Sequence, residues 1–362
     1  MGKIHLVDRQ VQRPIQAPAP GTEVNIAADI SSTKWVYGVR WQGEERYRLS
    51  TPAGLKHLEA LVGRFEGCPI RFAYEACGFG FEAAWLLAER GVEVTVIAPS
   101  RMERAPGLQV KTDRNDVGKM VRKLEQRDLK GIHIPSRLAH ERRQLVRTYG
   151  QAIKERKREQ TRIRSLMQEH GRRGPVPSAG WEAYHQWLRT QELPESVQPC
   201  VEALLSMRVI ADAQVKRLRG LLLALAKHPD YRPITVALCC QGGVGELSAI
   251  RFILELFDIT RFRTADSIGH YLGLTPSEYS SGPTVERGPI LKAGPGSLRA
   301  AMLQCGWASV HRGGDPELRE MFERLVVRAG KKRAIVAVTR RLVTRLRAKW
   351  MEVLQTQAPE AA

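Results

Sequence analysis

Apolar and polar residues alternate with a period of two in several short runs of the first third of the chain. Three runs, Val24–Asp29, Trp35–Trp41 and Glu45–Leu49, are separated only by short polar turns, which predicts an antiparallel meander. Two later runs, Ile70–Glu75 and Val92–Ile97, predict further strands.

Segments with helical periodicity lie before, between and after these later strands. Helices are expected at about 52–65 and 81–90, and a third opens near Asp113. The order of three strands, helix, strand, helix, strand and helix is typical of an RNase H-like α/β domain. We assign this domain to residues 23–136.

The two ends of the chain lack these patterns. Residues 1–22 are rich in Pro, Ala, Gln and Gly, a composition that predicts a disordered arm, and residues 355–362 predict a disordered tail. The length of the arm exceeds what the chemistry below requires, and its sequence does not indicate a task.

The middle of the chain predicts a helical coiled-coil segment over residues 137–230. One long helix is expected from Leu138 to about His170, a break follows at Gly171–Pro177, and a second helix begins after Pro199. The second helix has a seam with 3-4 spacing, formed by Val201, Leu204, Arg208, Ala211, Val215, Leu218, Leu222 and Leu225. Such a seam packs against the preceding helix or against another subunit.

Residues 231–354 predict a mainly helical C-terminal domain with little strand signal. Gln241–Gly245 is expected to be a tight turn between two helices, where glycines would let backbone amides approach a phosphate; a plain helix cap is the alternative. The final helix is expected to open at Gly330–Arg333.

The net charge of the chain narrows the range of functions that it could have. The chain of 362 residues has 57 Lys and Arg against 38 Asp and Glu, a formal net charge of +19. Such an excess favours a nucleic-acid partner. The six cysteines show no C-x-x-C pair, and no apolar run approaches the length of a membrane span. We therefore expect a cytoplasmic protein without a membrane partner.

Four carboxylates stand out against this basic background. Asp29 lies within an apolar strand, Glu75 ends another, and Asp113 and Asp116 are one helical turn apart. An RNase H-like domain assembles its metal site from such residues. A pair of Mg²⁺ ions ~4 Å apart, with Mn²⁺ as a substitute, would relieve carboxylate repulsion and clamp a phosphodiester. Favourable interaction with a helix dipole explains Asp113 and Asp116 alone, but not Asp29.

Ser281 is the candidate nucleophile. It lies in Tyr279–Gly282, which by itself predicts only a turn, and adjacent Ser280 is a rival on spacing alone. Cationic residues follow it, as attack on phosphorus requires. The candidate nucleic-acid-binding residues are Arg156, Lys157, Arg162, Arg287, Lys292, Arg299, Lys331, Lys332 and Arg333.

Taken in order, short motifs from Val24 to about Trp350 resemble those of the DEDD-type insertion-sequence transposases, which are bridge-RNA-guided serine recombinases. The motifs are the Asp29 strand, Glu75–Gly78, Lys111–Asp116, Gly243–Gly245, Gly273–Pro276, Tyr279–Gly282, Lys292–Gly294, Leu298–Arg299 and Gly330–Lys332. One departure from the family pattern is Gly242, where a proline is usual, which puts a DNA contact by that turn in doubt.

The resemblance implies specific roles. Asp29, Glu75, Asp113 and Asp116 would be the metal-binding tetrad, and the Ser-Gly dipeptide favours Ser281 as the covalent nucleophile. It also implies a RuvC-like N-terminal domain, a coiled-coil dimerisation segment and a C-terminal transposase domain. The partners it implies are donor and target double-stranded DNA, a noncoding guide RNA, and further copies of the chain in a homodimer that assembles into a tetramer, in a prokaryotic source. The alternatives are a RuvC-like Holliday-junction resolvase that uses metal-activated water, and an inactive nucleic-acid-binding protein.

Overall fold

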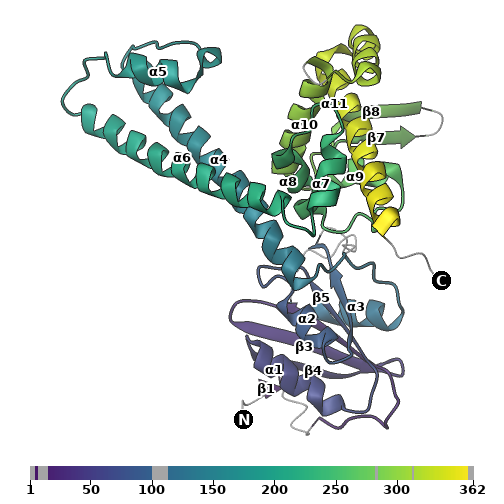
Figure 1. The fold of residues 1–362 in the computed structure, drawn as a ribbon. Helices are drawn as coiled ribbons and strands as arrows, with labels where there is room; N and C mark the ends of the chain where they lie inside the picture. Colours follow the sequence, from purple (N-terminus) through teal and green to yellow (C-terminus); the bar gives the residue numbers. More distant parts are fainter. Residues whose placement is uncertain (1–4, 7–14, 100–112, 282–283, 312–313, 358–362) are drawn as a thin grey trace. The chain divides into compact units, whose positions relative to one another are not determined.

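A computed structural model describes residues 5–6, 15–99, 113–281, 284–311 and 314–357. The chain divides into two compact units, Met1–Arg137 and Leu138–Ala362 (Figure 1). Each unit has its own apolar core, so each is described separately.

The first unit is built on a mixed sheet of six described strands in the order β1-β4-β3-β2-β5-β6. The strands are β1 (His5–Leu6), β2 (Val24–Ile30), β3 (Lys34–Trp41), β4 (Glu44–Pro52), β5 (Ile70–Glu75) and β6 (Glu93–Ile97). β2, β3 and β4 form the expected antiparallel meander, whereas β5 joins β2 in parallel and β6 joins β5 in parallel. The sheet therefore confirms the strands predicted from alternation.

Helices cover both faces of this sheet. They are α1 (Leu55–Val62), followed by a 3₁₀ turn at Gly63–Phe65, α2 (Glu82–Ala88) and α3 (Asp113–Glu125). Apolar side chains of α1 and α2 pack on one face, and those of α3 pack on the other. Because β2 is buried on both faces, its apolar run is nearly continuous.

Small residues let α3 lie close to the sheet. Gly38 on β3, Ala27 on β2 and Ala73 on β5 are paired neighbours in one row across the strands. A Cβ atom on Gly38 would come within 3.0 Å of Val117 Cγ1 on α3. The row of small residues thus forms the surface on which the helix packs.

The described part of the 1–22 segment corrects our expectation of a disordered arm. His5 and Leu6 pair with β4, the backbone of Gln16 hydrogen-bonds to the Tyr47 hydroxyl, and the Gly21 amide donates to Gly67 O at 2.9 Å. These contacts form through the backbone, which a composition poor in apolar residues does not reveal.

The second unit begins with a helical hairpin. Its helices are α4 (Arg137–Glu169), α5 (Gly180–Leu188) and α6 (Gln198–Ala226), with a 3₁₀ turn at Pro177–Ala179 (Figure 1). Val146 and Tyr149 of α4 share an apolar cluster with Val215 and Leu222 of α6. The predicted seam of α6 therefore packs on the preceding helix of the same chain. Arg208, the polar intruder in the seam, lies over the Trp181 ring of α5 at 4.4 Å.

The rest of the second unit is a helical bundle around one core. The helices are α7 (Arg232–Cys239), α8 (Glu246–Leu256), α9 (Ala265–Tyr271), α10 (Gly296–His311) and α11 (Pro316–Gln357). α11 is interrupted at Gly330, whose φ of 77° and ψ of 161° are not helical, so a new helical stretch begins where the sequence predicted it. The helix continues to Gln357, which corrects the expected start of a tail at 355.

Two strands interrupt the helices, contrary to the weak strand signal. β7 (Pro276–Ser281) and β8 (Thr284–Ile290) form an antiparallel hairpin that projects from the helices of this unit (Figure 1). The strands are polar on both sides of the chain, with Pro, Ser, Glu, Thr and Arg among their residues, so no apolar alternation marks them.

The turn at Gln241–Gly245 joins α7 to α8, as predicted. Gly243 has φ +87°, and a Cβ atom there would lie 2.5 Å from the backbone nitrogen of Ser309 on α10. The Ser309 hydroxyl donates to Gly242 O at 2.6 Å. The glycine is therefore required for close packing on α10, and a phosphate is not needed to explain it.

Replacing Gly243 with alanine should destabilise the second unit by about 2 kcal/mol or more, because it adds backbone strain and a steric clash. The matched control is Gly220→Ala in α6, where φ is ordinary and no atom lies within 4 Å of the new Cβ. That change should stabilise the helix by about 0.5–1 kcal/mol. Denaturant unfolding of both variants measures these changes; a neutral Gly243→Ala would contradict the packing role.

Candidate active site

Two candidate acids lie side by side at the end of two parallel strands. In the β2–β5 ladder Val24 is level with Ile70 and Ala28 with Tyr74, so the next pair is Asp29 with Glu75. Alternation along each strand places both acids on the face that carries Ala27 and Ala73, which is the face covered by α3. Both residues are half-buried. The register thus joins two acids that are 46 positions apart in sequence.

The direction of α3 brings its first turn to the same edge of the sheet. Arg71, at the start of β5, donates to Leu124 O at the end of α3 at 2.7 Å, so helix and strand run in opposite directions. From this contact Asp116 lies about 12 Å back along the helix. Glu75 lies about 13 Å along the strand. Asp116, which is half-buried, therefore lies towards the same edge of the sheet as Glu75.

The other acid of the α3 pair is Asp113, the first residue of the helix. Its side chain and residues 100–112 lie outside the described part of the chain. The first turn of a helix stabilises negative charge, so both aspartates occupy a favourable position there.

The loop after Glu75 is anchored to the sheet. The Tyr74 hydroxyl donates to Gly80 O at 3.1 Å, and burial raises the pKa of Tyr74 above its ordinary value, so this phenol stays protonated as a donor. Phe79, which is 42% exposed, packs edge-on against Trp35. The loop is therefore held at both a polar and an aromatic contact.

Carboxylates are suitable ligands for Mg²⁺, and half-burial leaves room for the waters that this ion retains. Among the residues whose side chains are described, however, three Asp, Glu, His or Cys groups do not come together closely enough to hold a metal ion. The residues therefore fit Mg²⁺ by their type and by the edge of the sheet on which they lie.

Ser281 belongs to the second unit and ends β7. It pairs with Thr284, and Ser280 pairs with Val285. Residues 279–281, which were expected to lie in a turn, are thus the end of a strand in a β-hairpin. The side chains of residues 279–287, including Ser281 and Arg287, lie outside the described part.

Three of the candidate phosphate-binding residues have partners within the chain. Arg156 pairs with Asp212 at 3.2 Å, Arg162 pairs with Glu159 at 3.0 Å, and Arg299 donates to the carbonyls of Leu272 and Ala293. The other described candidates are exposed: Lys157, Lys292, Lys331, Lys332 and Arg333. The exposed group is better placed to bind phosphate, because its cations need not leave a partner.

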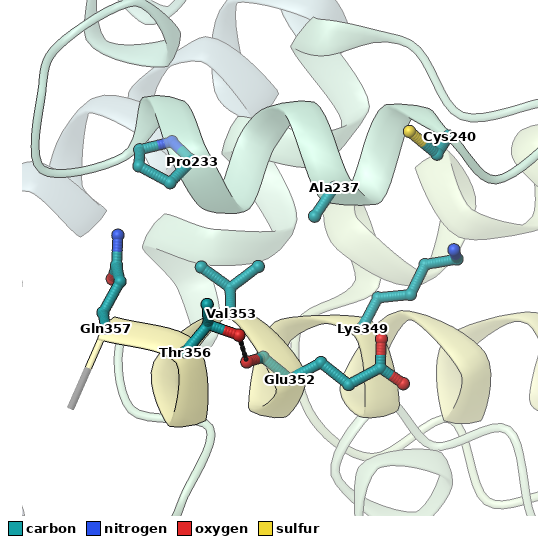
Figure 2. Close-up of a pocket in the computed structure, with 8 residues that line it drawn as sticks. All are labelled: Pro233, Ala237, Cys240, Lys349, Glu352, Val353, Thr356 and Gln357. Atoms are coloured by element: carbon teal, nitrogen blue, oxygen red, sulfur yellow. Dashed lines mark hydrogen bonds between the residues drawn. The ribbon is translucent and has the colours of Figure 1, made fainter. Parts of the chain in front are cut away.

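A groove of about 500 Å³ lies between α7 and the end of α11 (Figure 2). Its lining includes Ala237, Cys240, Lys349 and Glu352, and the Thr356 hydroxyl donates to Glu352 O at 2.9 Å. The lining contains none of the predicted site residues.

Among the helices in the described part of the chain, none combines the length and the apolar character that a membrane span requires.

The contacts of Arg299 were not predicted from sequence. A basic residue in a basic region suggests phosphate binding, whereas its guanidinium holds two backbone carbonyls. The glycines of two neighbouring motifs, Gly273 and Gly294, are the signal that two backbone segments approach closely there.

Comparison with known protein families gives two matches along the chain. Residues 26–171 match a transposase family model of the DEDD type named for IS110, and residues 238–323 match the model described as "Transposase IS116/IS110/IS902 family". Together the matched regions span more than half of the chain. The first contains Asp29, Glu75, Asp113 and Asp116, and the second contains Ser281.

Among curated proteins, the chain is similar to a Sinorhizobium fredii protein named "Putative transposase y4qE". The two are 28% identical over 270 residues. This alignment covers 74% of the present chain and 65% of the relative, so the chain spans slightly less than two thirds of that protein's length.

Proposed function

Since this chain belongs to the IS116/IS110/IS902 family of transposases, we propose that it cuts and rejoins DNA during movement of a genetic element. The observation that supports this proposal most directly is the register that pairs Asp29 with Glu75 at one edge of the sheet, towards which the first turn of α3 also points. We assign the first unit to the RNase H-like fold on its antiparallel meander, parallel β5 and β6, and covering helices.

Asp29, Glu75, Asp113 and Asp116 would hold Mg²⁺. When bound, Mg²⁺ neutralises the carboxylates and the phosphate oxygens and so lets nucleic acid approach this acidic edge. Two features support this assignment: the β2–β5 register pairs Asp29 with Glu75, and α3 begins at Asp113 and includes Asp116. The described acids are half-buried, so the surrounding apolar side chains fix their backbone while the carboxylates remain accessible.

Ser281 would be the nucleophile of strand exchange. Its hydroxyl oxygen would form a bond to phosphorus, its proton would leave, and the 3′ or 5′ oxygen of the broken phosphodiester would depart as a hydroxyl after taking up a proton. The number of phosphoester bonds is unchanged, so rejoining by the reverse attack needs no energy source. A position at the tip of a projecting hairpin suits a group that must reach DNA.

We also propose that the partners are double-stranded DNA and a noncoding guide RNA, bound by a homodimer that forms a tetramer. The net charge of +19 supports a polyanionic partner, and the exposed Lys331, Lys332 and Arg333 offer contacts at the start of a helical stretch. The guide RNA and the assembly follow from the family resemblance.

Neutralising an acid of the tetrad should abolish cleavage with little effect on stability. Asp29→Asn or Asp113→Asn should lower the cleavage rate in Mg²⁺ by at least about 100-fold, because each removes a charged ligand. The unfolding midpoint should hold or rise, since carboxylate repulsion falls. The matched control is Asp128→Asn, an exposed acid paired with Lys123 beyond the other end of α3. Full activity of either tetrad variant would refute the assignment.

Ser281→Ala should bind DNA normally but form no covalent protein-DNA species, because the exposed lysines and arginines supply the affinity. Ser280→Ala is the matched control and should keep the adduct. Denaturing gels and peptide mapping of trapped complexes test both variants. Adducts that map to Ser280 would refute the assignment, and cleavage without any adduct would favour a resolvase that uses water.

The acids and Ser281 lie in different units, so an active site shared between subunits can be tested by mixing. Mixed oligomers of Asp113→Asn and Ser281→Ala proteins should regain some cleavage, because one pairing joins an intact tetrad to an intact serine. A mixture of Asp29→Asn and Asp113→Asn proteins is the matched control and should stay inactive. Inactivity of verified mixed oligomers of the first kind would show that each chain builds its own site.

A further inference from the structure

Both strands of the Ser281 hairpin leave the helical part of the second unit at one place. The Leu291 amide, after β8, donates to Thr275 O, before β7, at 2.9 Å. The Lys292 amide donates to Gly273 O at 3.2 Å. These two hydrogen bonds join the arms at the base of the hairpin.

Two glycines allow the arms to come closer than other residues would permit. Gly273 has φ +65°, and a Cβ atom there would lie 2.2 Å from Ala293 O. Gly294 has φ +75°, and a Cβ atom there would lie 1.9 Å from Tyr271 O. The two segments are therefore packed backbone to backbone.

Arg299 closes this arrangement from the first turn of α10. Its Nη1 atom donates to Leu272 O at 2.9 Å and to Ala293 O at 2.9 Å. One carbonyl precedes β7 and the other follows β8. Both N–H groups of Nη1 are used, so a single nitrogen ties the two arms to each other and to α10.

We infer that Arg299 is a positioning residue that fixes the direction of the hairpin, and not a phosphate contact. The part of this inference that concerns Ser281 rests on the proposed function. An isolated two-stranded hairpin is marginally stable, so its base must supply its orientation. Residues 276–278 and 288–290 are half-buried or exposed, and the strands project from the helices (Figure 1).

The length of the hairpin makes its base important. Ser281 is five residues beyond Pro276, about 17 Å along the strand. A tilt of about 10° at the base would move the tip by about 3 Å over that length. A misplacement of about 1 Å at a reacting group can cost about 100-fold in rate. Loss of the Arg299 contacts should therefore reduce chemistry far more than binding.

The experiment compares Arg299→Met with Lys331→Met, which removes an exposed cation elsewhere in the second unit. The first readout is DNA affinity against salt concentration. Arg299→Met should leave the slope of log K against log salt unchanged, whereas Lys331→Met should reduce its magnitude by about 0.9. A smaller slope for Arg299→Met would identify Arg299 as a phosphate contact and overturn the inference.

The second readout is amide hydrogen exchange in the full chain. In Arg299→Met the Leu291 and Lys292 amides should exchange at least about tenfold faster, while the Phe252 amide in buried α8 should not change. Faster exchange at all three sites would indicate loss of global stability instead. In that case Arg299→Lys, which keeps an N–H donor and the charge, decides: it should restore Phe252 protection and only part of the protection of Leu291 and Lys292. Equal protection at all three amides would overturn the inference.

The third readout is the yield of the covalent adduct at saturating DNA, which should fall at least about tenfold in Arg299→Met and recover in part in Arg299→Lys. An unchanged yield would show that the Arg299 contacts do not position the serine. Absence of an adduct in the unchanged protein would refute the serine chemistry and with it this part of the inference. The salt and exchange results would still decide whether Arg299 holds the hairpin.

Discussion

The parallel pairing of β2 with β5 is the constraint on which the candidate site depends. One register brings Val24 level with Ile70 and, at the other end, Asp29 level with Glu75. A shift of one residue would move Glu75 to the opposite face of the sheet, away from α3. The buried pairs between these ends oppose such a shift, because every apolar side chain of β5 would exchange faces with it. The apolar core therefore determines where the acids meet.

The pairing of β2 with β5 also helps to form the surface on which α3 packs. Gly38, Ala27 and Ala73 form a row of small residues, and on β2 and β5 this row lies two residues before the acids. The helix lies so close to the row that a Cβ atom on Gly38 would touch Val117. Hydrogen bonding of Arg71 to Leu124 O then fixes the direction of the helix. The negative charge gathered at this edge is balanced in part by the first turn of α3. Packing thus brings the first turn of α3, which stabilises negative charge, to the end of the sheet where the acids lie.

What could be predicted from sequence follows from the kind of contact involved. The strands and long helices were predictable because their side chains are buried with periods of two or 3.6 residues. The β7–β8 hairpin was not, since its sequence has no apolar alternation that would indicate strands. The N-terminal segment was missed because its contacts are made by backbone groups, such as Gly21 with Gly67. Arg299 was assigned to nucleic acid because composition cannot distinguish a cation that binds phosphate from one that binds carbonyls.

The motifs that identify this family are therefore of two physical kinds. Gly243, Gly273 and Gly294 are required by backbone contacts within the second unit, each closer than a Cβ atom would allow. Asp29 and Glu75 are half-buried acids at a sheet edge, and Ser281 ends a strand of the hairpin. The glycines therefore specify the fold of the second unit, whereas Asp29, Glu75 and Ser281 are the residues proposed to act on DNA.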